Sequence, residues 1–353
     1  MRHQLSYLFL SASVVTLMAA GKTYAIESSP TPGPSVGHRP VVKNLKLVNS
    51  QSKDITQSTT QLEPGDTISL LNATVSDIDG DISGAGAYCI WYKVAVSGGT
   101  PIMVYDPGPN DRNCSYTLKD SDIGFRIKNT IKFYSDQSIA INQNYTINPV
   151  ESVGIDTLSS RIVTTPHPFS GMLSNGTIFS SSSGFPSTGF ANASFQLQVN
   201  GSSASNRNYE WVTEDPSVVS VNDIGEVFLK SKIVGDVNIV AINMMGGQSY
   251  TLRLKINTWY SIFKNVNLTQ AKGKCGAGMP SGTELSSGTG DRRVGSVWGE
   301  WGNNQYIIGG VPVNYQNAWT REKTPGGELV IGMNNGARYF GSPNDKFIGI
   351  CKN

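Results

Sequence analysis

The first 25 residues constrain the fold most, because they read as a signal for export. A weakly basic start precedes a largely apolar segment, residues 5–20, that is too short to span a membrane. The tripeptide Thr23-Tyr24-Ala25 then places small residues at positions −3 and −1 of a cleavage site. We expect a signal peptide over residues 1–25, so the mature chain folds outside the cytoplasm in an oxidising environment.

The chain has four cysteines, and an even number in an exported protein indicates two disulfides. Three pairings are open. Proximity in the sequence favours Cys89 with Cys114 and Cys275 with Cys351, which would place each bridge inside one domain. In the chain-entropy model such loops stabilise a protein by roughly 3–4.5 kcal/mol each, the longer loop more.

Hydrophobic periodicity predicts a mainly β protein. The length of 353 residues suggests two or three domains, and residues 26–40 are a linker rich in Ser, Pro and Gly. Over 41–150, runs such as "YCIWYKVAV" and "FRIKNTIKFYS" alternate between turn signals. This pattern predicts an immunoglobulin-like (Ig-like) β-sandwich that contains Cys89 and Cys114, with Trp91 in its core.

A second β unit is expected over 151–257, although the fold of its first 40 residues stays open. The stretch "YEWVTEDPSVVSVNDIGEVFLKSKIVGDVNIVAI" reads as alternating strands and turns. It resembles the bacterial Ig-like modules of surface adhesins. That resemblance places Trp211 in the sandwich centre, Gly225 in a tight turn, and Val237, Ile239 and Ala241 on the inner face.

The last segment, residues 258–353, is richer in Gly and Trp and its hydrophobic pattern is less regular. Leu268, Ala271 and Cys275 fall on one face of a short helix. Ser281 and Glu284 form a capping box, which predicts a second short helix. Short strand-like runs follow up to Cys351. We therefore expect a small α+β domain whose early helix and last strand are joined by Cys275–Cys351.

This segment resembles the C-terminal C-type-lectin-like domain of the intimin/invasin family. The resemblance is carried by "QAKGKC", "MPSGTEL", Trp298-Gly299, "AWT" at 318–320 and the terminal "GICKN". It implies two Ig-like sandwiches followed by a small α+β lectin-like domain. The Glu-Pro-Asn, Gln-Pro-Asp and Trp-Asn-Asp motifs with which sugar-binding relatives hold calcium do not occur, so calcium-dependent sugar binding is not expected.

Intimins and invasins carry a large outer-membrane β-barrel ahead of their passenger domains, and we expect this chain to have no room for one. It is similar to stand-alone secreted exoproteins that are exported with an intimin-like barrel protein. The resemblance implies a secreted or surface-associated adhesin, related to virulence, whose partner is a host cell-surface protein or the barrel transporter. The net charge of +2 gives no reason to expect nucleic acid.

The sequence offers few residues for enzymatic catalysis. Of three histidines, one leaves with the signal peptide and one lies in the linker, so only His167 remains. We expect no enzyme and no cofactor. The best metal candidate is "DIDGD", where Asp77, Asp79 and Asp81 alternate as hard ligands suited to calcium. The competing reading is a β-turn with solvated carboxylates.

The segment "GDRRVGSVWGEWGNNQY", residues 290–306, is the predicted binding site. Arg, Trp and Tyr are the residue types enriched in binding hot spots. We expect Arg292, Arg293, Trp301 and Tyr306 to contact a partner, with Trp298 in the core. The leading hypothesis is a non-enzymatic module that binds a protein through its lectin-like domain. The alternative is an export partner that docks through its N-terminal β domains onto an intimin-like barrel.

Overall fold

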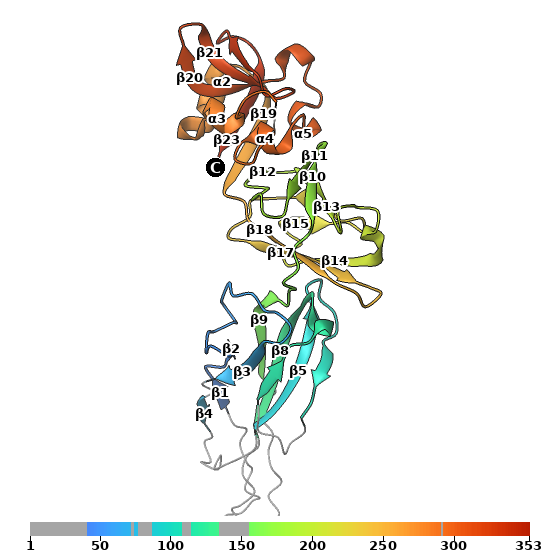
Figure 1. Cartoon of the computed structure of the whole chain (residues 1–353). Coiled ribbons are helices and arrows are strands. Elements are labelled where there is room, and N and C mark those ends of the chain that lie inside the picture. Colours follow the sequence, from blue (N-terminus) through green and yellow to red (C-terminus); the bar gives the residue numbers. More distant parts are fainter. Residues whose placement is uncertain (1–40, 72–73, 77–86, 108–113, 134–154, 291) are drawn as a thin grey trace, which may run out of the picture.

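The computed structural model describes residues 41–71, 74–76, 87–107, 114–133, 155–290 and 292–353. The expected signal peptide and linker lie outside this part of the chain. Three units follow one another along an elongated molecule, with the N-terminal unit at the bottom of Figure 1 and the C-terminal unit at the top. The expected fold class is confirmed: the protein is mainly β, with two Ig-like sandwiches followed by a small α+β lectin-like domain.

The N-terminal unit packs two sheets face to face. Its elements are β1 (Val41–Lys43), β2 (Lys46–Asn49), β3 (Thr67–Leu71), β4 (Thr74–Ser76), β5 (Ala87–Ala95), β6 (Ile102–Tyr105), β7 (Ser115–Thr117), η2 (Asp120–Asp122), β8 (Phe125–Phe133) and β9 (Ile155–Ile162). The sheet orders are β2-β3-β7 and β6-β5-β8-β9, and β1 pairs with β4. Trp91 is buried between the sheets and stacks on Tyr116, with ring centroids 5.8 Å apart. The Cys89–Cys114 disulfide joins β5 to the residue before β7, and so links the two sheets.

The second unit is also a sandwich. Its elements are β10 (Gly171–Ser174), β11 (Thr177–Ser180), β12 (Thr188–Phe190), β13 (Ser194–Gln198), η3 (Asn206–Asn208), β14 (Tyr209–Thr213), β15 (Val219–Val221), β16 (Glu226–Leu229), β17 (Val237–Asn243) and β18 (Tyr250–Leu254). The sheet orders are β11-β10-β13-β16-β15 and β14-β17-β18. Gly225 has φ +74°, and a Cβ there would lie 2.4 Å from the Trp211 ring. Two constraints therefore favour glycine at this turn: the positive φ, and the Trp211 ring, which leaves no space for a side chain.

Strand β17 is buried on both faces, which its alternating sequence pattern does not predict. Val237, Ile239 and Ala241 point into the second sandwich as expected. Val240 instead packs in the hydrophobic core of the N-terminal unit. The reason is that β17 lies at the junction of the two units, so its outer face is covered as well.

The C-terminal unit is built on one mixed sheet flanked by short helices. Its elements are β19 (Thr258–Val266), α2 (Leu268–Cys275), η4 (Gly276–Gly278), α3 (Gly282–Leu285), α4 (Val297–Trp301), α5 (Gln305–Ile308), η5 (Val313–Tyr315), β20 (Asn317–Thr324), β21 (Gly327–Gly332), β22 (Arg338–Gly341) and β23 (Phe347–Lys352). The sheet order is β12-β19-β23-β20-β21-β22. Both predicted helices are present as α2 and α3, and Ser281 caps α3 with Glu284 in the expected capping box.

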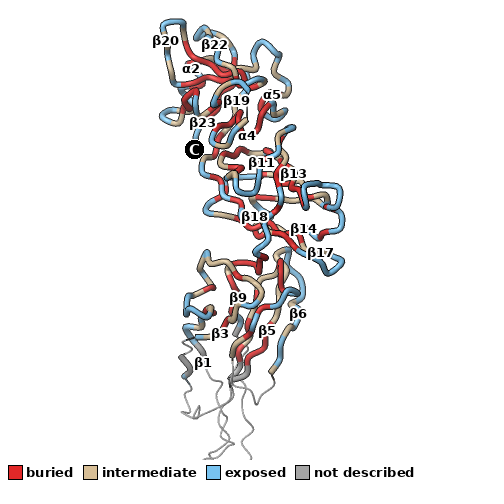
Figure 2. Tube along the Cα trace, in the orientation of Figure 1, coloured by how far each residue is buried: buried red, intermediate tan, exposed pale blue. Residues whose placement is uncertain are grey.

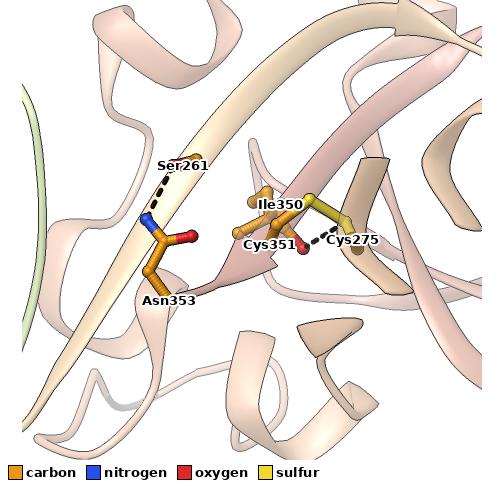
Figure 3. Close-up of a disulfide and its surroundings, with 5 residues drawn as sticks. All are labelled: Ser261, Cys275, Ile350, Cys351 and Asn353. Atoms are coloured by element: carbon orange, nitrogen blue, oxygen red, sulfur yellow. Dashed lines mark hydrogen bonds between the residues drawn. A yellow bond between two sulfur atoms is a disulfide. The ribbon is translucent and has the colours of Figure 1, made fainter. Parts of the chain in front are cut away.

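The second disulfide joins the beginning of this unit to its end. Cys275, at the end of α2, is bonded to Cys351 in the last strand, as Figure 3 shows. The Cα atoms are 4.9 Å apart, and Asn353 donates a hydrogen bond from Nδ2 to Ser261 Oγ at 2.7 Å beside the bridge. The chain terminus is therefore held against β19 and β23.

The division of the chain at residues 150/151 and 257/258 stays a prediction, because two strands cross it. Strand β9 lies after the first boundary, yet it pairs with β8 of the N-terminal unit. Strand β12 lies before the second boundary, yet it pairs in parallel with β19 of the C-terminal unit. Hydrogen bonding to a neighbouring sheet edge, which local sequence does not show, decides where these strands lie.

A charged joint connects the first two units. Arg161, at the end of β9, forms ion pairs with Glu214 and Asp236 across the junction, at 3.2 and 3.1 Å. Glu214 also accepts a hydrogen bond from the backbone N–H of Ile162 at 2.9 Å. Burial would raise the pKa of Asp236, but the nearby guanidinium groups of Arg253 and Arg161 outweigh it and hold this pKa below its ordinary value. Among the described residues, no helix has both the length and the apolar character needed to cross a membrane.

The capping box of α3 should make stability depend on pH. The backbone N–H of Ser281 and the ammonium group of Lys352 bond to the Glu284 carboxylate and lower its pKa to about 2. Since the folded-state pKa lies below the ordinary value of 4.5, the stabilisation is complete above that value and is lost as pH falls toward 2. Glu284→Gln should lower the melting temperature by roughly 1–3 °C at pH 7 and leave it unchanged at pH 2.

Scanning calorimetry at both pH values measures this difference. Glu210→Gln, at an exposed carboxylate of β14, is the matched control and should show no such change. A destabilisation by Glu284→Gln that is equal at pH 7 and pH 2 would mean that the charge of Glu284 does not contribute.

Candidate binding surface

The predicted binding segment, residues 290–306, folds into two short helices at the junction with the second unit. Helix α4 begins after Ser296, whose side chain accepts a hydrogen bond from the backbone N–H of Gly299. Helix α5 begins after Asn304, whose side chain accepts from the backbone N–H of Tyr306. Trp298 lies in the core as expected, and Gly336, with φ +73°, leaves space for its ring.

Trp301 is fully buried, with 0% of its surface exposed. Its ring packs against Phe185 and Phe190 of the second unit, each with a centroid distance of 5.4 Å. Its indole Nε1 donates a hydrogen bond to Thr188 Oγ1 at 2.9 Å. The expectation that Trp301 contacts a partner at the surface is therefore wrong, because β12 and the residues before it cover the ring.

Arg292 also reaches into the second unit. Its Nη1 donates hydrogen bonds to the carbonyl oxygens of Ser174 and Asn175, at 2.8 and 2.7 Å, and its Nη2 donates to the carbonyl of Glu300. Asn175 Nδ2 donates in return to the Trp301 carbonyl at 3.2 Å. Burial lowers the pKa of the Arg292 guanidinium. Arg292 thus fastens the β10–β11 turn to α4 and has few donors left for another molecule.

Glu300 of α4 is fully buried and also bonds to residues of the second unit. Its carboxylate accepts hydrogen bonds from the backbone N–H and hydroxyl of Thr188, at 2.8 and 2.7 Å, from the N–H and hydroxyl of Ser187, and from the N–H of Gly295 at 2.8 Å. A buried carboxylate is tolerated when its oxygens are paired in this way. We name Arg292, Glu300 and Trp301 with the residues they contact the α4 joint.

The α4 joint makes the second and C-terminal units one body. A single hydrophobic core runs through both units, and Figure 2 shows buried residues on both sides of the junction. Strand β12 adds to the C-terminal sheet beside β19. Two of the four predicted binding residues therefore hold the units together. Arg293 and Tyr306 are exposed, and their role in binding stays a prediction.

The metal candidate made of Asp77, Asp79 and Asp81 lies outside the described residues. In the ranges that the structure describes, no three side chains of the types His, Cys, Asp or Glu come together as a metal site would need.

A different surface of the C-terminal unit exposes apolar and aromatic side chains. Val313 and Tyr315 of η5 are 71% and 45% exposed, and Tyr306 of α5 is 40% exposed. The Tyr306 ring stacks on Phe190 of the second unit, with centroids 5.9 Å apart. Lys264 is near both tyrosines: its Nζ is 5.8 Å from the Tyr306 ring centroid, and its side chain lines a cleft together with Tyr315. We name Tyr306, Val313 and Tyr315 the tyrosine patch.

The cleft beside the patch has a volume of about 530 Å³. Its lining residues are Lys264, Asn265, Gly310, Val311, Pro312, Tyr315, Asn344, Asp345 and Lys346. A bulge in β19 shapes one wall, where Asn265 takes φ +58° and the pairing with β23 shifts. Two ammonium groups and one carboxylate line the cleft, and the Asp345 carboxylate accepts a hydrogen bond from the Ser342 N–H at 2.7 Å. The local charge therefore favours an acidic group next to an apolar one.

Several bonds fix the loop that carries the patch. Lys264 Nζ donates to the carbonyl of Gly309 at 2.6 Å. The side chain of Gln316 donates to the carbonyl of Val311 at 2.9 Å, and the carbonyl of Gln316 accepts from the N–H of Met333 at 2.8 Å. The patch is thus presented by an ordered loop, which lowers the entropy lost on binding.

Sequence reasoning overlooked this loop. Its signal is "GGVPVNYQN", residues 309–317, where valines and a tyrosine stand beside Gly and Pro with no periodicity that would bury them. An apolar residue in such a loop is a candidate for contact with a partner.

Comparisons with known proteins found relatives of parts of this chain. Residues 170–254 match the family model described as invasin, domain 4. Invasin of Yersinia enterocolitica is 29% identical over 160 residues, which cover 42% of this chain. The match covers 19% of that invasin, so the chain spans about a fifth of the length of this curated relative.

Two solved structures were also found to be similar at low identity. The crystal structure of invasin, titled a bacterial integrin-binding protein, has a TM-score of 0.45 and 19% identity, and covers 87% of this chain and 79% of its own. The C-terminal 282-residue fragment of intimin, solved with the intimin-binding domain of the translocated intimin receptor, has a TM-score of 0.38 and 16% identity. That match covers 89% of this chain and all of the fragment.

Proposed function

We propose that this chain, which is a protein of the intimin/invasin family, is a non-enzymatic adhesin that binds a protein partner through its C-terminal lectin-like domain. The tyrosine patch carries this proposal. Exposed tyrosines beside an apolar residue and a cleft are typical of protein-binding surfaces. The N-terminal unit acts as a spacer that holds this surface away from the other end of the elongated molecule.

The partner chemistry follows from the patch and its cleft. Val313 and Tyr315 offer an apolar contact, while Lys264 and Lys346 offer ammonium groups at the cleft. The complementary surface on the partner would present an apolar side chain next to a carboxylate. We propose that the chain is secreted or associated with the bacterial surface, and that this partner is a host cell-surface protein.

The test is the double variant Val313→Asp/Tyr315→Ala in the full chain. It replaces two exposed contacts and should weaken binding to cultured epithelial cells by roughly 10- to 100-fold. Because both side chains are largely exposed, the melting temperature should change little. Flow cytometry with fluorescently labelled protein measures the binding. Protease treatment of the cells should abolish binding by the wild-type chain, since the partner is a protein.

Deleting residues 258–353 would be a poor test of this proposal. The deletion would remove β19 from β12 and uncover Phe185 and Phe190, so a loss of binding could reflect misfolding.

Val234→Asp is the matched control for the double variant, because Val234 is exposed on the second unit. Equal binding by the wild-type chain and the double variant would refute a role for the patch.

A second candidate function is docking onto an intimin-like outer-membrane barrel through the N-terminal unit. The observation that favours it is β6, an edge strand that exposes Ile102, Met103 and Tyr105. This alternative requires that Ile102→Lys/Met103→Lys lowers secretion from cells that contain the barrel. The patch variant would then be secreted and would bind as the wild-type chain does.

A further inference from the structure

Strand β22 is the outer edge of the C-terminal sheet. It pairs with β21 on one side, and it is the last strand in the order β12-β19-β23-β20-β21-β22. Its sequence is Arg338-Tyr339-Phe340-Gly341, and the two aromatic residues are 41% and 60% exposed. Exposed edge strands are usually protected by lysine, proline or a bulge. This strand instead displays aromatic side chains beside unpaired backbone groups.

The hydrogen-bond pattern shows which backbone groups are open. The N–H of Gly332 donates to the carbonyl of Ala337 at 2.8 Å, so residues 332 and 337 form a hydrogen-bonded pair. Such pairs alternate along an antiparallel ladder. Since Val330 lies opposite Tyr339 and Glu328 opposite Gly341, these pairs are bonded as well. The backbone groups of Arg338 and Phe340 therefore point away from β21, toward the open side.

The neighbouring pair of strands supports this assignment. The N–H of Met333 donates to the carbonyl of Gln316 at 2.8 Å. Because bonded positions alternate, the backbone groups of residues 329, 331 and 333 point toward β20. Residues 328, 330 and 332 then bond toward β22. The same alternation leaves Arg338 and Phe340 facing outward.

We propose that β22 pairs with β22 of a second copy of this chain, in antiparallel register about Tyr339. The outward groups require that a hydrogen-bonded pair joins Arg338 of one copy to Phe340 of the other. The two-fold axis passes between the Tyr339 residues, so the same pair forms twice. The two sheets then become one continuous sheet through four added hydrogen bonds.

The side chains are complementary in this register. On one face, each Arg338 guanidinium lies against the Phe340 ring of the other copy, which is a favourable cation–π pair. On the other face, the two Tyr339 rings meet at the closely spaced, non-hydrogen-bonded position. Centring on Arg338 would set two guanidinium groups against each other, which is unfavourable.

Centring on Phe340 would set Arg338 opposite Ser342, which lies beyond the end of β22 and whose N–H already donates to Asp345. The register about Tyr339 is therefore the one that uses every outward group of the strand.

A cysteine at the two-fold axis tests this register. The four native cysteines are paired in the two disulfides, so an introduced cysteine is the one free thiol. In Tyr339→Cys the two Cα atoms would be about 4.5 Å apart, which a disulfide can span. In Phe340→Cys they would be about 7–8 Å apart, which it cannot. We expect Tyr339→Cys to form a disulfide-linked dimer in mild oxidant, and Phe340→Cys to stay monomeric under the same conditions.

Charge variants in the full chain provide a second measurement. Sedimentation equilibrium should show a concentration-dependent monomer–dimer equilibrium for the wild-type chain. Phe340→Arg sets arginines opposite each other and should weaken dimerisation roughly tenfold or more. Adding Arg338→Glu creates two Glu–Arg pairs and should restore the dimer. Ile178→Arg is the matched control, because Ile178 is also 60% exposed on an edge strand, β11.

The proposal is overturned by a chain that stays monomeric up to millimolar concentration and does not crosslink through Tyr339→Cys. It is also overturned if Phe340→Cys crosslinks better than Tyr339→Cys. A monomeric chain in which Phe340→Arg lowers binding to epithelial cells would instead assign the strand edge to a foreign polypeptide.

Discussion

Replacing Trp301 with alanine should lower the free energy of unfolding by about 3–5 kcal/mol, the cost of removing a large buried aromatic side chain. The ring packs against Phe185, Phe190 and Phe195, with centroid distances of 5.4, 5.4 and 6.3 Å. Since one core runs through the second and C-terminal units, their common unfolding transition should move to lower temperature in scanning calorimetry.

Two further variants show what Trp301 contributes. Trp301→Phe keeps much of the apolar volume but loses the hydrogen bond to Thr188, so we expect a smaller loss of about 1–2 kcal/mol. Tyr315→Ala removes a half-exposed ring and should cost about 0.5 kcal/mol. If Trp301→Ala were as mild as Tyr315→Ala, the α4 joint would not hold the two units together.

Removing the Cys275–Cys351 disulfide by a double alanine substitution should lower the free energy of unfolding by about 4.5 kcal/mol. The bridge closes a loop with a sequence separation of 76 residues, and in the chain-entropy model a longer loop restricts the unfolded chain more. The loss should appear in the common unfolding transition of the second and C-terminal units. Denaturant unfolding of the oxidised wild-type chain and the double variant measures the difference.

The Cys89–Cys114 pair provides the comparison for this prediction. Its sequence separation is 25 residues, so its removal should cost about 3.5 kcal/mol and affect the N-terminal unit. If the common transition of the second and C-terminal units occurred at the same denaturant concentration with and without Cys275–Cys351, the stabilising role of that bridge would be contradicted.

The local sequence predicted those features that depend on residues close together in the chain, and it predicted the two disulfide pairs. The capping box of Ser281 and Glu284, the short helix from Leu268 to Cys275, and the turn at Gly225 were all expected and are present. Each depends on contacts within a few residues or on one nearby ring. The positions of Trp91 and Trp298 in cores follow from hydrophobic burial alone.

Contacts between units could not be predicted in this way. Trp301 and Arg292 have the composition of a binding hot spot, and a buried joint between domains uses the same residue types as an interface between proteins. What decides between the two is the parallel pairing of β12 with β19, which joins residues about 70 positions apart. Sequence analysis did not identify Val313 and Tyr315 because their loop has no hydrophobic periodicity. Their exposure depends on how the sheet and helices of the C-terminal unit pack around the loop.

Hydroxyl-radical footprinting of the folded chain tests most directly which aromatic side chains face a partner. Tyr306 and Tyr315 are substantially exposed and Trp301 is buried. We expect rapid oxidation of the two tyrosines and protection of Trp301, with the indole reacting only after unfolding. Oxidation of Trp301 in the native chain as fast as that of Tyr315 would contradict both the buried joint and the assignment of recognition to the tyrosine patch.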